Sequence, residues 1–311
     1  MRIVFMGTPD FAVPSLRALL DSGYDVVGVF CQPDRPKGRG NKMTACPVKE
    51  LALSAGIPVY QPERIKRAEG VEMLRSCKPD LCVTAAFGQL LSQEILDIPP
   101  LGTVNVHSSL LPRHRGSAPI NWAIIKGDSV TGVTTMFTDI GMDTGDMLLT
   151  RETPIGDTET AGELSDRLAV MGAELLVETL RSLEAGILTR TPQNPDEATY
   201  EPKMDKALGL IDWSKPAREI DWLVRGTTPW PGAYTTLGEG SMKVFEVRIC
   251  GGKPEAAPGT VLASDAKAGL VVACGDAQLE LVQIQMPGAK RMNARDYLRG
   301  HAIQAGSVLG R

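Results

Sequence analysis

The sequence predicts an α/β protein, in which a mostly parallel, Rossmann-like sheet with helices on both faces is followed by a small, OB-like β-barrel domain. Two observations carry this prediction: strand-like and helix-like segments alternate in the first part of the chain, and about five short strand-like runs occupy roughly the last hundred residues. A Pro-rich stretch separates the two parts. We therefore expect a Rossmann-like domain at residues 1–188, a linker at 189–206 and a barrel domain at 207–311.

The first domain begins with the apolar strand 3–6, a turn at 7–10 and a helix at 14–22 that Gly23 ends. Further strands are expected at residues 25–30, 59–60, 81–84 and 103–107, and further helices at 48–55 and 160–185. In the last of these helices, apolar side chains recur at helical spacing and predict a buried face, namely Leu164, Leu168, Met171, Leu175 and Leu176. Such alternation favours parallel pairing, because parallel neighbours need a crossover connection.

The linker is marked by its prolines and by Asn194. After it we expect a helix at 217–225 and a last helix at 294–299 that Asn293 caps. The strands between these helices are expected at residues 234–237, 242–250, 260–263, 270–273 and 278–285. Short strands in this number are typical of a small OB-type barrel, a fold that often binds oligonucleotides.

The composition is that of an ordinary soluble protein: 43% of residues are hydrophobic, 23% are charged and the formal net charge is −4. It has no overall basic excess of the kind that indicates nucleic-acid binding. The charge is unevenly distributed, since residues 201–311 hold 14 Lys+Arg against 12 Asp+Glu, whereas residues 1–200 hold 19 against 25. A polyanion is therefore expected to prefer the second domain and particular loops of the first.

Six cysteines with no C-x-x-C pair predict reduced, buried thiols, not a disulfide framework or a zinc site. No apolar stretch reaches the roughly 18 residues that span a bilayer, so we expect a cytoplasmic protein that neither is secreted nor enters a membrane. The turn after the first strand lacks the G-x-G-x-x-G pattern of dinucleotide binding. We therefore expect neither NAD nor a metal as cofactor.

The strand 103–107 carries the strongest candidates for catalysis. Asn105 and His107 lie two residues apart, so in an extended strand both side chains point to the same face. Asp143 follows about thirty residues later between Gly141 and Gly145, whose backbone freedom indicates a tight loop. An amide, an imidazole and a carboxylate could together perform an acyl transfer. The alternative is structural: polar groups that satisfy loop backbone, and an Asx-turn carboxylate.

An insertion at residues 34–47 separates a strand from a helix. With the following Lys49 it carries five basic residues against one acidic residue, and its Gly and Pro content predicts no regular structure. It is either a solvated surface loop or an arm that contacts phosphates and becomes ordered on binding.

Several separate blocks of the sequence resemble the folate-dependent formyltransferases. These blocks are Asn105-x-His107-x-Ser109-Leu110-Leu111-Pro112, Arg113-x-Arg115-Gly116, Pro119-Ile120-Asn121-Trp122 and Gly141-Met142-Asp143-Thr144-Gly145. Further blocks at residues 5–14, 211–214 and 229–234 are similar to the members of the family that formylate a charged tRNA. The likeness covers essentially the whole chain. His114 departs from it, since an aromatic residue is expected between the two arginines.

The resemblance implies that a formyl group is transferred from 10-formyltetrahydrofolate to the α-amine of methionine esterified to initiator tRNA. The matching catalytic residues are Asn105, His107 and Asp143. The matching residues of the folate site are Ser109, Leu110, Leu111 and Pro112. The family's insertion loop contacts the acceptor end of the tRNA, and its basic residues here are Arg35, Lys37, Arg39 and Lys42. A monomer without a membrane partner is expected.

Three other functions stay open at this stage. A formyltransferase acting on a small amine, such as an amino sugar nucleotide, would share the catalytic motif, although the basic insertion favours tRNA. A non-catalytic nucleic-acid-binding protein would use the α/β part as a scaffold only. A hydrolase would release formate from the folate without any acceptor.

Overall fold

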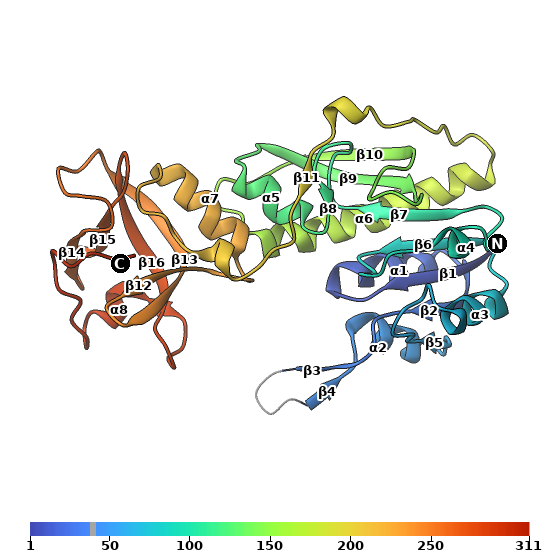
Figure 1. The fold of residues 1–311 in the computed structure, drawn as a ribbon, viewed down its shortest axis with the longest axis horizontal. Helices are drawn as coiled ribbons and strands as arrows, with labels where there is room; N and C mark the ends of the chain where they lie inside the picture. The colour runs from blue at the N-terminus through green and yellow to red at the C-terminus, as the bar shows by residue number, and fades with distance from the viewer. Residues whose placement is uncertain (38–41, 311) are drawn as a thin grey trace. The chain divides into compact units, whose positions relative to one another are not determined.

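The computed structural model describes residues 1–37 and 42–310, with no side-chain description for the two residues that flank the gap. The chain divides into two compact units, which are described separately (Figure 1). Unit 1 comprises Met1–Pro119, Val130–Pro154 and Ser165–Glu201, and unit 2 comprises Ile120–Ser129, Ile155–Leu164 and Pro202–Arg311. By this division, residues 189–201 of the expected linker belong to unit 1.

Unit 1 is built on a seven-stranded sheet. In spatial order its strands are β10 (Met147–Pro154), β9 (Val130–Phe137), β7 (Thr103–His107), β6 (Leu81–Ala85), β1 (Arg2–Gly7), β2 (Asp25–Phe30) and β5 (Val59–Tyr60). The five strands from β7 to β5 are parallel and follow the doubly wound order 3-2-1-4-5, whereas β9 and β10 are antiparallel to their neighbours. The mostly parallel sheet is thereby confirmed.

Helices cover both faces of this sheet. They are α1 (Val13–Asp21), α2 (Pro47–Ser54), α3 (Ala68–Cys77), α4 (Gln93–Leu96) and α6 (Ala161–Glu184), whose first four residues are assigned to unit 2. The helix α5 (Pro119–Ile125) belongs to unit 2 except for Pro119. Gly172 of α6 lies so close to the sheet that a Cβ there would meet Val106 and Val133. On the opposite face, α3 and α4 bury Leu74 and Ile95 in one apolar cluster with residues of β1 and β6. Four of the five residues expected on the buried face of α6 are indeed buried; Met171 is half-buried.

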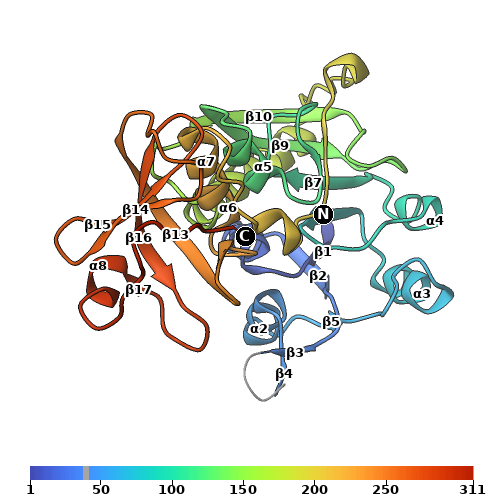
Figure 2. The ribbon, with the colours of Figure 1, turned by 60° about the vertical axis from the view of Figure 1, so that its left-hand side comes forward.

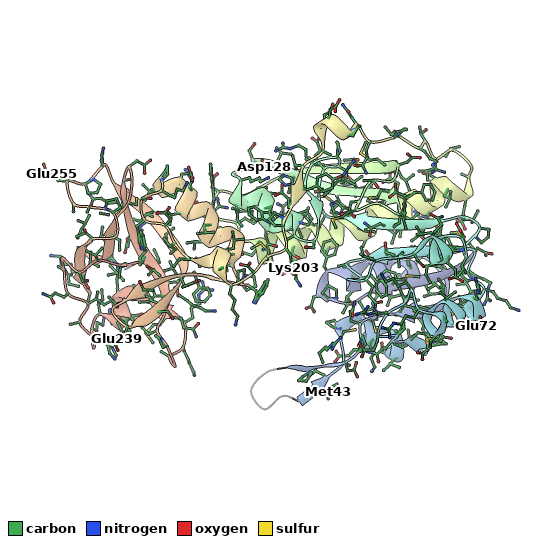
Figure 3. All side chains as sticks on the ribbon, in the orientation of Figure 1. Met43, Glu72, Asp128, Lys203, Glu239 and Glu255 are labelled. Atoms are coloured by element: carbon green, nitrogen blue, oxygen red, sulfur yellow. The ribbon has the colours of Figure 1, made fainter. Side chains whose placement is uncertain are left out.

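Two features of unit 1 differ from the sequence prediction. The first is the antiparallel pair β9 and β10, which was not anticipated. The second is the insertion, which forms a two-stranded hairpin of β3 (Arg35–Lys37) and β4 (Lys42–Thr44), so the expected lack of regular structure there was wrong. Each strand of a two-stranded ribbon has an unpaired edge, which is where a proline such as Pro36 is tolerated. Figures 1 and 2 both show the hairpin extending beyond α2, and Met43, labelled in Figure 3, is 60% exposed.

Unit 2 contains a six-stranded antiparallel sheet. Its strands are β12 (Ala233–Leu237), β13 (Gly240–Gly251), β16 (Gln278–Gln285), β15 (Gly269–Ala273) and β14 (Val261–Asp265) in this spatial order, with β17 (Met292–Asn293) paired to β16. The register of β13 against β16 shifts at three places, as expected for a strand that bends within a small barrel. The predicted fold class is therefore confirmed.

Two helices accompany the sheet of unit 2, α7 (Ala217–Thr227) and α8 (Ala294–Tyr297). The predicted cap is present, because the Asn293 side chain accepts a hydrogen bond from the Arg295 backbone N–H at 2.9 Å. The core includes the buried Trp213, whose indole N–H donates to the Thr235 hydroxyl at 2.9 Å. Within the described residues of both units, we find no helix whose length and hydrophobicity would let it span a bilayer.

Candidate active site

The candidate catalytic residues Asn105 and His107 lie on β7, on one face of the sheet in unit 1. β7 pairs with β6 on one side and with β9 on the other, so that Asn105 stands opposite Thr84 and His107 opposite Thr134. Val106, between them, faces α6 instead. The predicted alternation along this strand is confirmed.

The amide of Asn105 is oriented by Thr84. The Thr84 hydroxyl donates to Asn105 Oδ1 at 2.8 Å, which turns the Nδ2 group the other way. Within residues 1–37 and 42–310, no hydrogen-bond acceptor is bound to that Nδ2. Thr84 was not predicted as a site residue, because only the register between β6 and β7 brings it beside Asn105. The result is a fixed amide with a free N–H donor.

The imidazole of His107 is buried, with 6% of its side chain exposed. Its Nε2 lies 3.1 Å from the carbonyl oxygen of His114. Because a carbonyl oxygen can only accept, Nε2 carries the hydrogen of this bond, and Nδ1 is the ring nitrogen that remains for another partner. Nδ1 lies 3.8 Å from Asp143 Oδ1, which is too long for a hydrogen bond but close enough for an ion pair when the ring is protonated.

Asp143 itself adopts a left-handed backbone conformation, with φ +52°. Its Oδ2 accepts a hydrogen bond from the Gly116 N–H at 2.8 Å, so Oδ1 is the oxygen that faces His107. The tight loop was predicted, but from the backbone freedom of Gly141 and Gly145, and that explanation was wrong. The residue with a positive φ is Asp143, not either flanking glycine. Gly145 is needed for space, since a Cβ there would lie 1.9 Å from the Phe137 carbonyl oxygen.

The loop after β7 contains the residues that were expected to line a folate site. Ser109 is fully buried and its hydroxyl donates to the Arg113 carbonyl at 2.8 Å, so this side chain holds the loop together. Thr134 of β9 braces the same loop, by donating to the Ser109 carbonyl and accepting from the Leu111 N–H. Leu110 and Pro112 are half-buried, whereas Leu111 is buried. Among these residues, Leu110 and Pro112 retain surface for a ligand.

Of the four basic residues of the insertion that were expected to bind tRNA, the structure describes the side chain of Arg35 alone. Arg35 is exposed on β3 and lies 3.6 Å from Glu63 in an exposed ion pair. Arg39 lies outside the described residues, and of Lys37 and Lys42 only the backbone, paired across the hairpin, is described. Lys49 is already used, because its ammonium group contacts Asp34 Oδ2 and Gln61 Oε1, each at 2.7 Å.

Two cysteines meet at the base of the hairpin. Cys46 is the N-cap residue of α2, and its pKa is lowered to about 6, chiefly by a hydrogen bond from the Cys31 thiol. The pKa of the buried Cys31 is raised by the same hydrogen bond and by burial. Cys250 of unit 2 is exposed and Cys46 is half-buried, so the prediction of six buried thiols was wrong for these two. In the described part of the chain, no three His, Cys, Asp or Glu side chains gather where they could hold a metal ion.

Comparison with known proteins defines the class. The model of the formyl transferase family matches residues 1–180, and the model of the formyl transferase C-terminal domain matches residues 203–302. The chain therefore belongs to the formyl transferase family. Within it, the chain is 51% identical to a methionyl-tRNA formyltransferase from Ruminiclostridium cellulolyticum and 53% identical to one from Acetivibrio thermocellus. Both alignments cover the whole of this chain and the whole of the relative.

Solved structures share the fold at low sequence identity. An N-formyltransferase from Helicobacter canadensis in complex with folinic acid and dTDP-3-aminofucose is 17% identical, with a TM-score of 0.66 over 93% of this chain and 99% of that chain. HypX from Aquifex aeolicus in complex with tetrahydrofolic acid is 20% identical, with a TM-score of 0.63 over 96% of this chain and 47% of that chain. At this identity the likeness concerns the fold.

Proposed function

We propose that this chain transfers the formyl group of 10-formyltetrahydrofolate to the α-amino group of methionine carried by initiator tRNA. The observation that carries the proposal is identity of about one half, over the full length, to relatives named methionyl-tRNA formyltransferase. The N-formyltransferase from Helicobacter canadensis that was solved with dTDP-3-aminofucose is a distant neighbour by comparison, at 17% identity. The site on β7 supplies the groups that such a transfer requires. We place the enzyme in the cytoplasm as a monomer.

The chemistry assigns a role to each side chain. The methionyl nitrogen attacks the formyl carbon, a carbon–nitrogen bond forms, and the formyl oxygen becomes an oxyanion. The free Nδ2–H of Asn105 and the protonated Nδ1 of His107 are donors for that oxyanion. Asp143 holds the imidazolium and accepts the proton that the amine loses, through a water molecule. The oxyanion then returns to a carbonyl as the carbon–N10 bond of the folate breaks, and N10 takes up the proton that Asp143 had accepted, through the same water molecule.

The basic hairpin is proposed to hold the phosphates of the tRNA. Arg35 is free enough to do so, because its ion pair with Glu63 is two-thirds exposed on both sides and is worth little in water. Replacing Arg35, Lys37, Arg39 and Lys42 together by Ser should weaken the binding of methionyl-tRNA and flatten its dependence on salt, with folate affinity unchanged. An unchanged salt dependence would remove the hairpin from the tRNA interface.

The substrate is tested by comparing acceptors. Purified protein is incubated with 10-formyltetrahydrofolate and, in separate reactions, with methionyl initiator tRNA, methionyl elongator tRNA or a dTDP-linked amino sugar. Rapid formylation of the initiator tRNA alone is expected. Formylation of the sugar instead would support the small-amine alternative, and release of formate without any acceptor would indicate a hydrolase.

A further inference from the structure

The segment that follows α6 reaches back to the active site of unit 1. We name residues 191–201 the strap. It begins at Thr191, which pairs with Met147 at the start of β10, and it ends in β11 (Tyr200–Glu201), which pairs in parallel with β8 (Arg115–Gly116). In Figure 1 this yellow segment runs beside β10 before it reaches β8. A stretch that looked like a linker is therefore anchored at both ends to the catalytic unit.

Gln193 of the strap holds the loop that carries Asp143. Its Nε2 donates to the carbonyl oxygens of Asp143 and Gly145, each at 2.8 Å. Its Oε1 accepts two hydrogen bonds from the Arg115 guanidinium, at 3.0 and 2.7 Å. A left-handed conformation is unfavourable for Asp143 and persists only when the surroundings enforce it. Gln193 supplies that enforcement, because one side-chain amide binds two carbonyl groups of the loop.

Glu201 and Thr199 of the strap hold the turn that orients His107. His114 has a left-handed backbone with φ +56°, its N–H donates to Thr199 Oγ1 at 2.8 Å, and its Nδ1 lies 2.9 Å from Glu201 Oε1. The His114 and Glu201 side chains are only 4% and 1% exposed. The carbonyl oxygen of this same His114 accepts from His107 Nε2. The turn therefore fixes the ring orientation of His107.

We propose that the strap is a positioning element of the formyl-transfer site, in which Gln193 acts through Asp143, and Thr199 and Glu201 act through His107. This inference rests on the proposed function. The strap residues need not touch the substrates; they fix the two groups that do. Small displacements of a catalytic group lower the rate strongly while leaving substrate binding intact.

The first test separates kcat from KM. Gln193→Met keeps the length of the side chain and removes its hydrogen bonds. Thr199→Val removes the hydroxyl that accepts from the His114 N–H and donates to Glu201, and Thr199→Ser restores it. We expect Gln193→Met and Thr199→Val to lower kcat by roughly 10- to 100-fold, with KM for both substrates changed less than about twofold. Thr199→Ser should recover most of the rate. Glu197→Gln is the matched control, since this exposed residue lies on the same segment and, among the described residues, its side chain is hydrogen-bonded only to Asn194.

The second test asks through which residue Gln193 acts. In an Asp143→Ala background, Gln193→Met should not lower kcat further, because the effects of substituting residues that act as a unit are not additive. Unchanged kcat in Gln193→Met and Thr199→Val, or the same loss in the Asp143→Ala background as in the wild type, would overturn the proposal. A wild-type protein that forms no formyl-methionyl-tRNA would refute the proposed function instead. Glu201→Gln keeps a hydrogen-bond partner for His114 Nδ1. The thermal melt of this variant shows whether the buried carboxylate is needed for folding.

Discussion

His107 donates its Nε2 hydrogen to the carbonyl oxygen of His114 at 3.1 Å, seven residues further along the chain. In the proposed mechanism, this bond leaves Nδ1 as the imidazole nitrogen that takes part in the chemistry. With Nε2 occupied, Nδ1 faces Asp143, and the free Nδ2 of Asn105 emerges from the same face of β7. Two donors and a carboxylate are thereby held on one rigid strand and one braced loop, as acyl transfer requires.

Removal of the Asn105 amide should impair catalysis more than binding. We expect Asn105→Ala to lower kcat by about 10²–10³-fold, because an oxyanion donor is lost. Thr84→Val keeps the side-chain shape but releases Asn105 Oδ1, and we expect a loss of roughly 10-fold that Thr84→Ser restores. Single-turnover formylation of methionyl-tRNA measures these rates. If Asn105→Ala turned over at the wild-type rate, the amide would be a structural group.

Gly116 should not tolerate a side chain, because of its backbone conformation and because of the space beside it. Gly186 shares only the first of these features and therefore serves as a control. The φ of Gly116 is +111°, and a Cβ would lie 2.7 Å from the Glu201 carbonyl oxygen, so Gly116→Ala should push β11 away and disturb the hydrogen bond to Asp143. Gly186 also has a positive φ, of +68°, but it faces open space. Both variants should lose roughly 1–3 kcal/mol of stability in thermal or urea unfolding. Only Gly116→Ala should also have a lower kcat. Equal kcat values in the two variants would contradict a role of Gly116 in holding Asp143.

Cysteine alkylation should follow pKa and not exposure. A hydrogen bond from Cys31 lowers the pKa of Cys46 to about 6, whereas the pKa of the exposed Cys250 is raised by burial of its sulfur and by the charge of Glu280. We expect iodoacetamide at pH 7 to modify Cys46 before Cys250, as read by peptide mass spectrometry. Cys31→Ala should move the pH midpoint of this reaction upward, because the Cys31 hydrogen bond is the main cause of the low pKa. Faster labelling of Cys250 would refute the assignment.

Glu280 should make the stability of unit 2 sensitive to acid. Burial raises the pKa of Glu280, but hydrogen bonds from Arg248 and Arg295 outweigh it and bring the pKa below its ordinary value of 4.5. A depressed carboxyl pKa stabilises the folded state above pH 4.5, and this contribution is lost as the pH falls through the folded pKa. Glu280→Gln should cost roughly 1–3 kcal/mol at pH 7 and flatten the acid limb of the unfolding curve.

The control for Glu280 is Glu246, an exposed carboxylate of β13. Glu246→Gln should change the free energy of unfolding by less than about 0.5 kcal/mol. If both variants lost the same stability, or if the acid limb stayed unchanged in Glu280→Gln, the buried ion pair would not be the cause.

Local patterns in the sequence predicted the elements that have a clear period. The strand carrying Asn105 and His107 was predicted residue by residue, because alternation by two is a property of the strand alone. β9 was missed because six of its eight residues are buried and three of those are threonines, so it shows neither alternation nor a continuous apolar run. Its burial depends on β7, β10 and α6, which a local window does not contain.

Long-range partners are the part that sequence patterns could not supply. Gln193 lies 50 residues from Asp143, and Glu201 lies 87 residues from His114. Their Pro-rich surroundings are typical of a linker, and the hydrogen bonds that make them part of the site arise only in the folded chain. Asp143 was selected from its position between two glycines, and its catalytic role was assigned by the resemblance to a family; its distance from His107 is a property of the folded chain alone.

The most direct test of the account is formyl transfer to methionyl initiator tRNA by the wild type and by His107→Ala, measured side by side at saturating 10-formyltetrahydrofolate. We predict that the wild type produces formyl-methionyl-tRNA and that His107→Ala, although folded and still able to bind folate, is slower by about 10²–10³-fold. A wild type that leaves the tRNA unmodified, or a His107→Ala variant with the wild-type rate, would contradict it.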